Sequence, residues 1–178
     1  MPELQDYIQI IPNALPPKFC EGITRSKGYR YEQATLLDLE SGEYKDNSYR
    51  NCEHTGLSRE DDAVVFGAVS RVVNQYMEGY RFVIESKQIN DTGYNLLRYK
   101  EGGFYRQHID DNKGVERRIS MSLLLNDDYD GGDFQFFGDY KVNCEAGSAI
   151  VFPSNYCFPH EILEVQSGER YSIVTWVF

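Results

Sequence analysis

Histidine is scarce in this sequence, with three residues in 178, and paired cysteine motifs and long hydrophobic runs are missing altogether. The four cysteines, Cys20, Cys52, Cys144 and Cys157, are widely spaced. Because no Cys-x-x-Cys pair is present, the common zinc and redox motifs are excluded, and reduced, partly buried thiols are expected. No apolar run approaches the roughly 20 residues that span a bilayer, and the N-terminus lacks the basic start and apolar stretch of a signal peptide. We therefore expect a soluble, cytoplasmic protein without a membrane partner.

Positive charge is the second shortage. The chain has 18 lysine and arginine residues against 28 aspartate and glutamate residues, which gives a formal net charge of −10. A chain of this charge is not drawn to the phosphate backbone by general electrostatic attraction. We expect no nucleic-acid partner, and a role in nucleic-acid repair is disfavoured.

The first part of the chain predicts a strand followed by a helix. Residues 7–12 alternate enough to form an opening strand. Pro16-Pro17 suits the first turn of a helix, because proline lacks the N–H group that is unpaired there. This helix would bury Phe19 and Ile23, which lie four residues apart, and would end near Gly28.

A second helix gives the clearest signal in the N-terminal half. Ser58 can cap it, and Asp61 three residues later completes a pattern like a capping box. One face carries an apolar stripe that runs as far as Gly79 and consists of Val65, Val69, Val72 and Tyr76. Such a helix is suited to packing against a sheet. Residues 29–57, between the helices, mix tyrosines with charges and are expected to form one or two irregular strands.

From residue 80 onwards the sequence consists of short apolar segments separated by glycine-containing turns. The predicted strands are 80–87, 93–100, 104–109, 117–126, 133–137, 140–144, 147–152, 158–164 and 170–177. Many short strands without intervening helices predict a mainly β (α+β) fold, a jelly-roll or double-stranded β-helix of the cupin type, with the two helices bracing one sheet. No linker or repeat marks a boundary, so residues 1–178 are expected to form one domain. Within it, residues 1–92 would supply helices and supporting strands, and residues 93–178 the β-helix core.

Three side chains are candidates for a metal site. His108 and Asp110 lie two residues apart at the end of a predicted strand, so their side chains share a face. His160, the only later histidine, lies in another strand-like run that a β-barrel can bring alongside. Two imidazoles and one carboxylate on one side of a divalent metal form the facial arrangement of non-haem Fe(II) oxygenases. Alternatively, His108 and Asp110 form a hydrogen-bonded surface pair and His160 is a core imidazole.

The last predicted strand carries a candidate anion site. Arg170, Ser172, Val174 and Trp176 share one of its faces. Arg170 and Ser172 can grip one carboxylate together, the guanidinium by two parallel hydrogen bonds and the hydroxyl by one. A buried cation requires an anionic partner, and a dicarboxylic cosubstrate is one. A structural ion pair with an acidic residue of the chain is the alternative.

Five motifs follow one another along the C-terminal half of the chain. They are Tyr99-x-x-Gly102-Gly103-x-Tyr105-x-x-His108-x-Asp110, Arg117-Arg118-Ile119-Ser120, Tyr129-Asp130-Gly131-Gly132-Asp133-Phe134, Ile150-Val151-Phe152-Pro153 before His160, and Gly168-Glu169-Arg170-Tyr171-Ser172-Ile173 ending in Trp176. With these motifs, the sequence from about Gly93 to Phe178 resembles the 2-oxoglutarate- and Fe(II)-dependent oxygenases. It is most similar to their prolyl 4-hydroxylase-like branch, which includes hypoxia-type and small bacterial and viral enzymes.

The resemblance implies roles for several residues. His108, Asp110 and His160 would hold Fe(II), and Arg170 would bind the distal carboxylate of 2-oxoglutarate. Tyr99 looks like the family's tyrosine near the cosubstrate, with a packing role as the alternative. The activity implied is that of an oxidoreductase, a dioxygenase that uses O2 and converts 2-oxoglutarate to succinate and CO2 while it hydroxylates a C–H bond. Ascorbate is an optional further cofactor.

One position departs from the family pattern. Prolyl hydroxylases often place a tyrosine on the third barrel strand, where it hydrogen-bonds the distal carboxylate of the cosubstrate. The matching residue here is Leu124, which has no hydroxyl group. Ser172, or else Ser122, would have to contribute a donor instead.

The expected substrate is a prolyl residue in a protein or peptide. One alternative keeps the chemistry and acts on a free amino acid or other small molecule. Another is a non-catalytic protein of the cupin type that binds a metal or a small acid.

Other features near the predicted barrel mouth have two interpretations each. The turn from Asp111 to Glu116 can close over a peptide, although most such loops are only solvated. Arg117 or Arg118 can meet peptide carbonyls, although a surface ion pair is the simpler expectation. The third histidine, His54, is not expected to be a ligand.

Overall fold

The computed structural model of the chain describes residues 2–38, 42–80, 90–111 and 116–178. Two sheets account for most of the regular structure. The larger sheet has seven strands in the order β1 (Gln9–Ile11), β13 (Ala149–Pro153), β9 (Ile119–Leu124), β16 (Arg170–Val177), β7 (Asn95–Tyr99), β6 (Glu53–Gly56) and β2 (Glu32–Gln33). The smaller has five, in the order β12 (Tyr140–Val142), β11 (Phe134–Phe136), β14 (His160–Ile162), β8 (Phe104–His108) and β5 (Arg50–Asn51). The predicted mainly β fold is confirmed.

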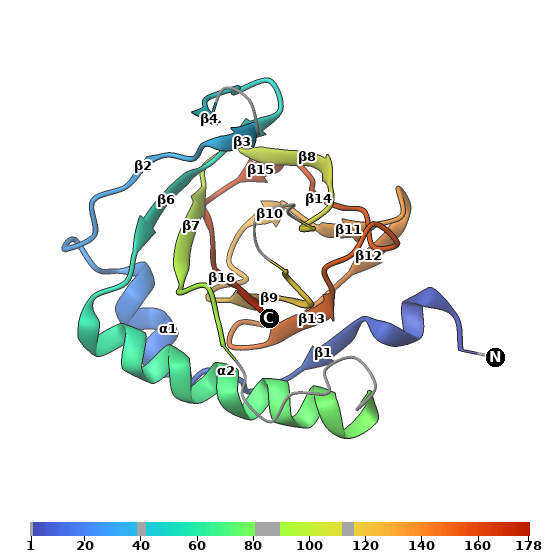
Figure 1. Ribbon diagram of the computed structural model, residues 1–178. Helices are drawn as coiled ribbons and strands as arrows, with labels where there is room; N and C mark the ends of the chain where they lie inside the picture. Colours follow the sequence, from blue (N-terminus) through green and yellow to red (C-terminus); the bar gives the residue numbers. More distant parts are fainter. Residues whose placement is uncertain (1, 39–41, 81–89, 112–115) are drawn as a thin grey trace.

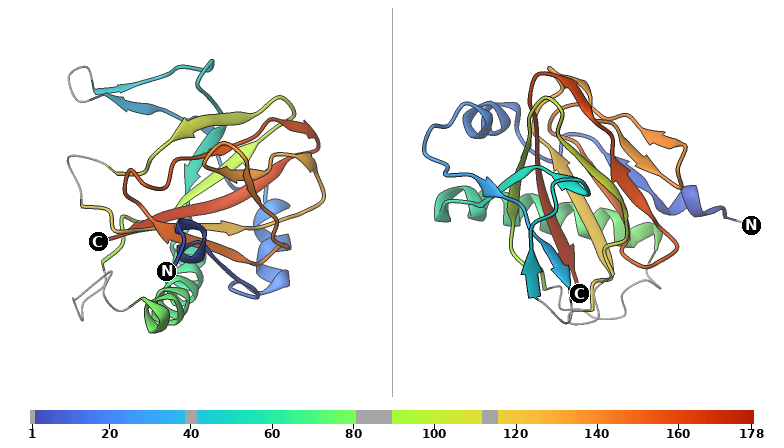
Figure 2. Two further views of the ribbon diagram at one scale, coloured as in Figure 1. Left: turned by 90° about the vertical axis from the view of Figure 1, so that its right-hand side faces the viewer. Right: turned by 90° about the horizontal axis from the view of Figure 1, so that it is seen from above.

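Seen end-on, the strands of the two sheets are arranged around a common centre, and α2 (Arg59–Gly79) runs across the outer side of the larger sheet (Figure 1). Two short pairs complete the β structure. The pair β10 (Asp130–Gly131) and β15 (Val165–Ser167) adjoins the core, and the hairpin of β3 (Leu36–Asp38) and β4 (Gly42–Tyr44) projects from the body of the molecule (Figure 2). A single 3-10 turn, Leu4–Tyr7, precedes β1.

Helix α2 begins and ends where the sequence predicts. The Ser58 hydroxyl accepts a hydrogen bond from the backbone N–H of Asp61 at 3.1 Å, which satisfies one of the unpaired donors of the first turn. Three acidic residues in that turn also interact favourably with the positive end of the helix dipole. The predicted apolar stripe of Val65, Val69, Val72 and Tyr76 is fully buried.

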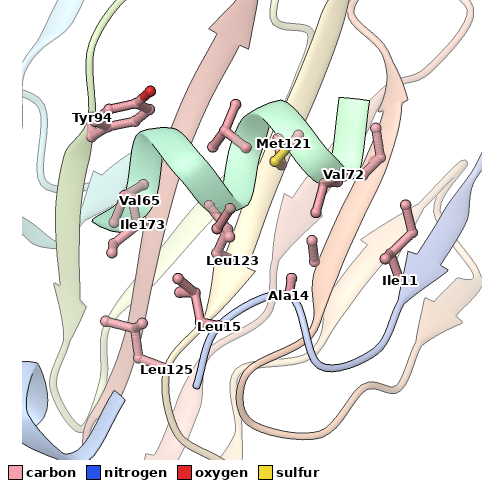
Figure 3. Close-up of a cluster of buried hydrophobic side chains, with 14 of the residues drawn as sticks. Ile11, Ala14, Leu15, Val65, Val72, Tyr94, Met121, Leu123, Leu125 and Ile173 are labelled. Carbon is pink, nitrogen blue, oxygen red and sulfur yellow. The ribbon is translucent and has the colours of Figure 1, made fainter. Parts of the chain in front are cut away.

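The stripe of α2 belongs to a hydrophobic cluster on the outer face of the larger sheet. Figure 3 shows Val65 and Val72 of α2 beside side chains of β9 and β16. The labelled sheet residues of this cluster include Met121, Leu123 and Ile173. A second cluster lies among strands of both sheets and is rich in aromatic rings, including Tyr99, Phe134, Phe136, Phe152 and Phe158.

Helix α1 (Pro17–Thr24) is shorter than predicted. It begins at the expected proline pair but ends at Thr24, so the predicted end near Gly28 is wrong. Cys20 and Ile23 are its buried residues, whereas Phe19 is only partly buried against the outer cluster.

The strand predictions are right in number and place for most of the C-terminal half, with shorter bounds. The pair β10 and β15 was not predicted, because two- and three-residue strands with a register shift carry no alternating signal. In the part of residues 29–57 that the structure describes, there are five short strands, β2 to β6, rather than one or two. The predicted strand at 80–87 lies outside the described residues except for its first residue.

Glycines mark the predicted turns. Gly131, Gly132, Gly138 and Gly168 all have positive φ, which favours glycine over residues with a Cβ atom. The four cysteines are free, as expected. Within the described ranges, no helix combines the length and apolar composition that crossing a membrane requires.

Candidate metal centre

His108 and His160 are brought together by strand pairing. His108 ends β8 and lies directly opposite His160, the first residue of the antiparallel strand β14. Their ring centroids are 4.3 Å apart. Asp110 follows β8 by two residues, so its carboxylate joins the same space.

The three predicted side chains form one cluster. Oδ1 of Asp110 is 3.9 Å from Nε2 of His108, and Oδ2 is 3.5 Å from Nε2 of His160. One donor atom from each residue lies within 4.8 Å of the other two. Over the described ranges, no other group of three or more histidine, cysteine, aspartate or glutamate side chains meets this condition. The geometry fits a single ion held by two nitrogens and a carboxylate.

Backbone carbonyls determine which imidazole nitrogen faces the cluster. Nδ1 of His108 is 2.8 Å from the carbonyl oxygen of Arg106, and Nδ1 of His160 is 3.0 Å from that of Phe158. Because a carbonyl oxygen only accepts hydrogen bonds, each Nδ1 carries the proton and donates it. The Nε2 lone pairs are therefore free to bind a metal.

Asp110 is buried and is oriented by a pair of serines. The hydroxyl of Ser120 donates to Oδ2 of Asp110 at 2.6 Å, and the hydroxyls of Ser120 and Ser154 are hydrogen-bonded at 2.8 Å. Burial acts to raise the pKa of the Asp110 carboxyl, but electrostatic interaction with His160 and His108 and hydrogen bonds with Ser120 and Trp176 outweigh it, and the pKa is lowered. The carboxylate is thus kept ionised, as a metal ligand must be.

His108 is kept neutral by its surroundings. Its ring stacks on that of Tyr105, with centroids 3.6 Å apart. Burial, followed by the charge of His160, lowers the pKa of His108 to about 3. A neutral imidazole is the form that binds a metal, and this donor set suits Fe(II) or a similar divalent ion.

The cluster opens into a cavity of about 700 Å³ that also holds Arg170. Arg170, Ser172, Val174 and Trp176, which are predicted to share one face of the last strand, all line this cavity. On the opposite face, Tyr171, Ile173 and Val177 belong to the cluster beneath α2.

Arg170 is buried without a counter-charge. It is only 2% exposed, and its Nη1 donates to the hydroxyl of Ser172 at 3.0 Å. Its Nε has no hydrogen-bond partner. Among the described residues, no carboxylate lies within ion-pairing distance of it, so nothing supports the structural ion pair considered as an alternative. A guanidinium buried in this way is strongly unfavourable unless an anion enters the cavity.

Tyr99 and Leu124 lie near Arg170 in different positions. The ring of Tyr99, 1% exposed, is 5.4 Å from the guanidinium carbon and lines the cavity. Leu124 pairs with Ser172 across β9 and β16 and contributes no polar atom. The alternative donor considered above, Ser122, is buried and lines the cavity.

The two arginines after the metal-bearing segment behave differently. Arg118 forms an exposed ion pair with Glu116 at 3.2 Å, as expected. Arg117 does not: its guanidinium lies 3.8 Å from the centre of the Trp176 ring and donates to the backbone carbonyl of Asp110 at 3.2 Å. Its Nε is buried without a partner. The interpretation of Arg117 as a surface ion pair is wrong.

Sequence reasoning did not assign roles to the residues that hold the candidate ligands. Ser120 and Ser154 orient Asp110, and Tyr105 supports His108. The role of Ser120 could have been indicated only by the alternation along β9, which turns Ser120 and Ser122 toward the cavity. His54 lies on β6, paired with Leu97. Residues 112–115 of the predicted mouth turn lie outside the described residues.

A 2-His-1-carboxylate cluster on a β scaffold defines the class of non-haem, divalent-metal sites that leave coordination positions open. Residues 94–178 match the family model of the 2OG-Fe(II) oxygenase superfamily. The match covers just under half of the chain, and it confirms the resemblance inferred from the motifs of this segment.

Curated relatives match just under half of the chain. A PKHD-type hydroxylase of Alteromonas mediterranea is 37% identical in a 93-residue alignment that covers 45% of this chain and 40% of that protein. A PKHD-type hydroxylase of Psychrobacter is 34% identical in a 92-residue alignment that covers 44% of this chain and 35% of that protein. The chain thus matches about two fifths of the length of these relatives.

Solved structures share the fold over nearly the whole chain. A prolyl hydroxylase of Trichoplax adhaerens in complex with a hypoxia inducible factor peptide has a TM-score of 0.72 at 18% identity, covering 97% of this chain and 83% of that one. A Pseudomonas putida prolyl-4-hydroxylase has a TM-score of 0.68 at 21% identity, covering 96% and 91%. A viral collagen prolyl hydroxylase of Paramecium Bursaria Chlorella virus-1, in complex with 2OG, has the same score at 18% identity, covering 96% and 94%. At these identities the likeness shows a shared fold.

Proposed function

We propose that this chain is an Fe(II)- and 2-oxoglutarate-dependent hydroxylase. The proposal rests on one cavity that has a site for a cation at one end and a site for an anion at the other. One end offers two imidazole nitrogens and a carboxylate, and the other offers a buried guanidinium without a counter-charge among the described residues. A metal ion bound together with a diacid satisfies both ends at once.

In this proposal, His108, Asp110 and His160 hold Fe(II), and Arg170 and Ser172 bind the distal carboxylate of 2-oxoglutarate. Tyr99 lies against Arg170 and closes one side of the cavity. When bound, the iron supplies the activation of O2 that couples conversion of 2-oxoglutarate to succinate and CO2 with hydroxylation of a C–H bond, and ascorbate is an optional reductant.

The protein's own part in the reaction is to orient and to shield. Carbonyl groups hold both imidazoles in the tautomer that exposes Nε2, and Ser120 fixes the carboxylate of Asp110. Apolar side chains of the inner cluster, among them Phe134 and Phe152, line the same cavity and limit the entry of water. This shielding strengthens the interaction between Arg170 and an anion.

We propose that residues 1–178 act as one domain. The two sheets would form a double-stranded β-helix core from residues 93–178, braced by the helices and strands of residues 1–92. Support comes from the shared hydrophobic cluster of α2 and the larger sheet, and from the coverage of nearly the whole chain by prolyl hydroxylase folds.

The proposed substrate is a prolyl residue in a protein or peptide. Aromatic side chains at the cavity, including Tyr49, Tyr105 and Trp176, offer flat walls for an apolar ring. Arg117, beside Trp176, has an unpaired buried Nε that can donate to a carbonyl oxygen. The Trichoplax neighbour, which shares the fold, is in complex with a peptide.

The test is turnover with defined substrates under Fe(II), 2-oxoglutarate and O2. Proline-containing peptides are compared with free amino acids, and both succinate release and a mass gain of one oxygen are measured. Hydroxylated peptide supports the proposal. Hydroxylation only of free amino acids keeps the chemistry and overturns the peptide substrate. Metal binding with no succinate and no affinity for 2-oxoglutarate indicates instead a cupin-type binding protein.

A further inference from the structure

Arg170 reaches past the main cavity to a second, smaller one. This smaller cavity, about 220 Å³, lies next to the turn after β9 and is lined by Leu124, Tyr129, Gly132, Cys144 and Arg170, among others. Arg170 lines both cavities. Contacts that its side chain makes in the smaller cavity therefore also affect the position of its guanidinium in the main cavity.

Tyr129 is the aromatic residue on that side of Arg170. It is partly buried, and burial raises the pKa of its hydroxyl, while the charge of Arg170 and a hydrogen bond with its guanidinium act in the opposite direction. The phenol is thus an uncharged partner that stabilises the guanidinium without neutralising it. An acidic residue in this place would satisfy the charge that an incoming anion needs.

Two glycines make room for this arrangement. A Cβ atom on Gly132 would lie 3.1 Å from Cδ of Arg170 and 3.2 Å from Cε2 of Tyr129. A Cβ atom on Gly168 would lie 3.1 Å from Cβ of Tyr129. Both glycines have positive φ, so a larger residue would be strained as well as crowded. The ring of Tyr129 and the stem of Arg170 therefore fit closely around the backbone of Gly132.

The residue opposite Ser172 on the neighbouring strand, Leu124, offers no polar group to Arg170. Leu124 is paired with Ser172 and lines the second cavity with an apolar side chain. The Ser172 hydroxyl, on the same strand, accepts a hydrogen bond from Arg170. Tyr129, on the turn beyond Leu124, lines the second cavity together with Arg170, and its ring and the Arg170 stem lie on either side of the space at Gly132.

We propose that Tyr129 is a positioning residue: its hydroxyl replaces the one missing at Leu124, holds Arg170 from the second cavity and thereby sets the length of diacid that the site accepts. This inference rests on the proposed function, because it assigns the length of a cosubstrate that the metal and Arg170 bind between them. A guanidinium held at one depth favours a five-carbon 2-oxo diacid over its longer homologue. A guanidinium released from Tyr129 adapts to either length.

The test compares Tyr129→Phe, which removes only the hydroxyl, with the wild-type chain. The dissociation constants of 2-oxoglutarate and of 2-oxoadipate, which is one methylene longer, are measured by calorimetry on protein loaded with Mn(II), without turnover. We expect 2-oxoglutarate binding to weaken about 10-fold, as is typical for loss of one hydrogen bond to a charged group. Binding of 2-oxoadipate should change less, so the preference between the two diacids falls. The affinity for Mn(II) should be unchanged.

Tyr140→Phe is the matched control. Tyr140 lies on β12 and lines neither cavity, so removal of its hydroxyl should alter neither diacid. If Tyr129→Phe binds both diacids as the wild type does, the inference is overturned and the proposed function stands. Equal weakening of both diacids also overturns it, because Tyr129 then contributes to affinity and not to length. A wild-type chain that binds neither diacid overturns the proposed function together with the inference.

Discussion

The two ends of the main cavity are built on opposite principles. At the metal end, the polar groups that face away from the cluster have protein partners: both Nδ1 atoms donate to carbonyls, and Asp110 accepts from Ser120. At the other end, Arg170 has a hydroxyl and a phenol around it but no carboxylate. The metal end is thus complete except for a cation, and the Arg170 end is complete except for an anion.

This difference indicates how the sites should respond to substitution. Ligands at the metal end act as a set, because removal of one leaves an incomplete coordination sphere. Groups at the Arg170 end act on one ligand through charge and hydrogen bonds, so their loss should be graded. The following predictions test that contrast, from the largest expected effect to the smallest.

The largest effect is expected from Asp110→Ala or His108→Ala. Each removes a proposed metal ligand, so stoichiometric Fe(II) binding and succinate formation should fall below detection. Metal content after dialysis and succinate output measure the two effects. The control is His54→Ala, which removes the third histidine from β6 and should leave both unchanged. Wild-type succinate output from the His108 variant would remove this residue from the mechanism.

Arg170→Met should separate the two ends. It removes the guanidinium but keeps an apolar side chain in the core, so 2-oxoglutarate affinity should fall about 100-fold, the loss typical of a buried charge partner. Metal affinity should be retained, as measured by calorimetry with Mn(II). Arg25→Met, on an exposed side chain of an i,i+4 pair, is the control. Loss of metal binding in the Arg170 variant would contradict the independence of the ends.

Ser120→Ala tests the support of the metal end. The substitution removes the hydrogen bond to Asp110 and should weaken metal binding by about 10-fold or slightly more, as is usual for groups that orient a ligand. A metal titration followed by intrinsic fluorescence can measure this. Ser70→Ala, on the exposed side of α2, controls for loss of a serine hydroxyl. Unaltered metal affinity in the Ser120 variant would show that Asp110 is oriented without it.

The smallest effect on the cavity is expected from Ser58→Ala, which lies outside it. Loss of the N-cap hydrogen bond of α2 should lower the free energy of unfolding by about 1 kcal/mol. Metal and 2-oxoglutarate affinities should not change. Chemical denaturation of the variant measures the first quantity and calorimetry the other two. A change at only one end of the cavity would reveal that α2 is coupled to that end.

Many of the helices and strands could be predicted from local sequence patterns. The apolar stripe of α2 follows the helical period of 3.6 residues, and its N-cap is a local pattern. Along β16 side chains alternate with a period of two, so the sequence shows which residues share each face of the strand. The same period of two places His108 and Asp110 on one side of the chain. Irregular segments were harder to predict. Helix α1 ends earlier than expected. Residues 29–57 contain more strands than expected, because short strand pairings depend on partners far away along the chain.

The sequence by itself determined the donor types, the order of the motifs and the alternating faces, since these depend on residues close together along the chain. Only the tertiary structure decided that His108 lies opposite His160, that Ser120 and Ser154 hold Asp110, and that Tyr129 lies beside Arg170 at Gly132. Each of these contacts joins separate strands or turns. Their geometry depends on sheet register and on the space left by Gly132, which local sequence periodicity does not encode.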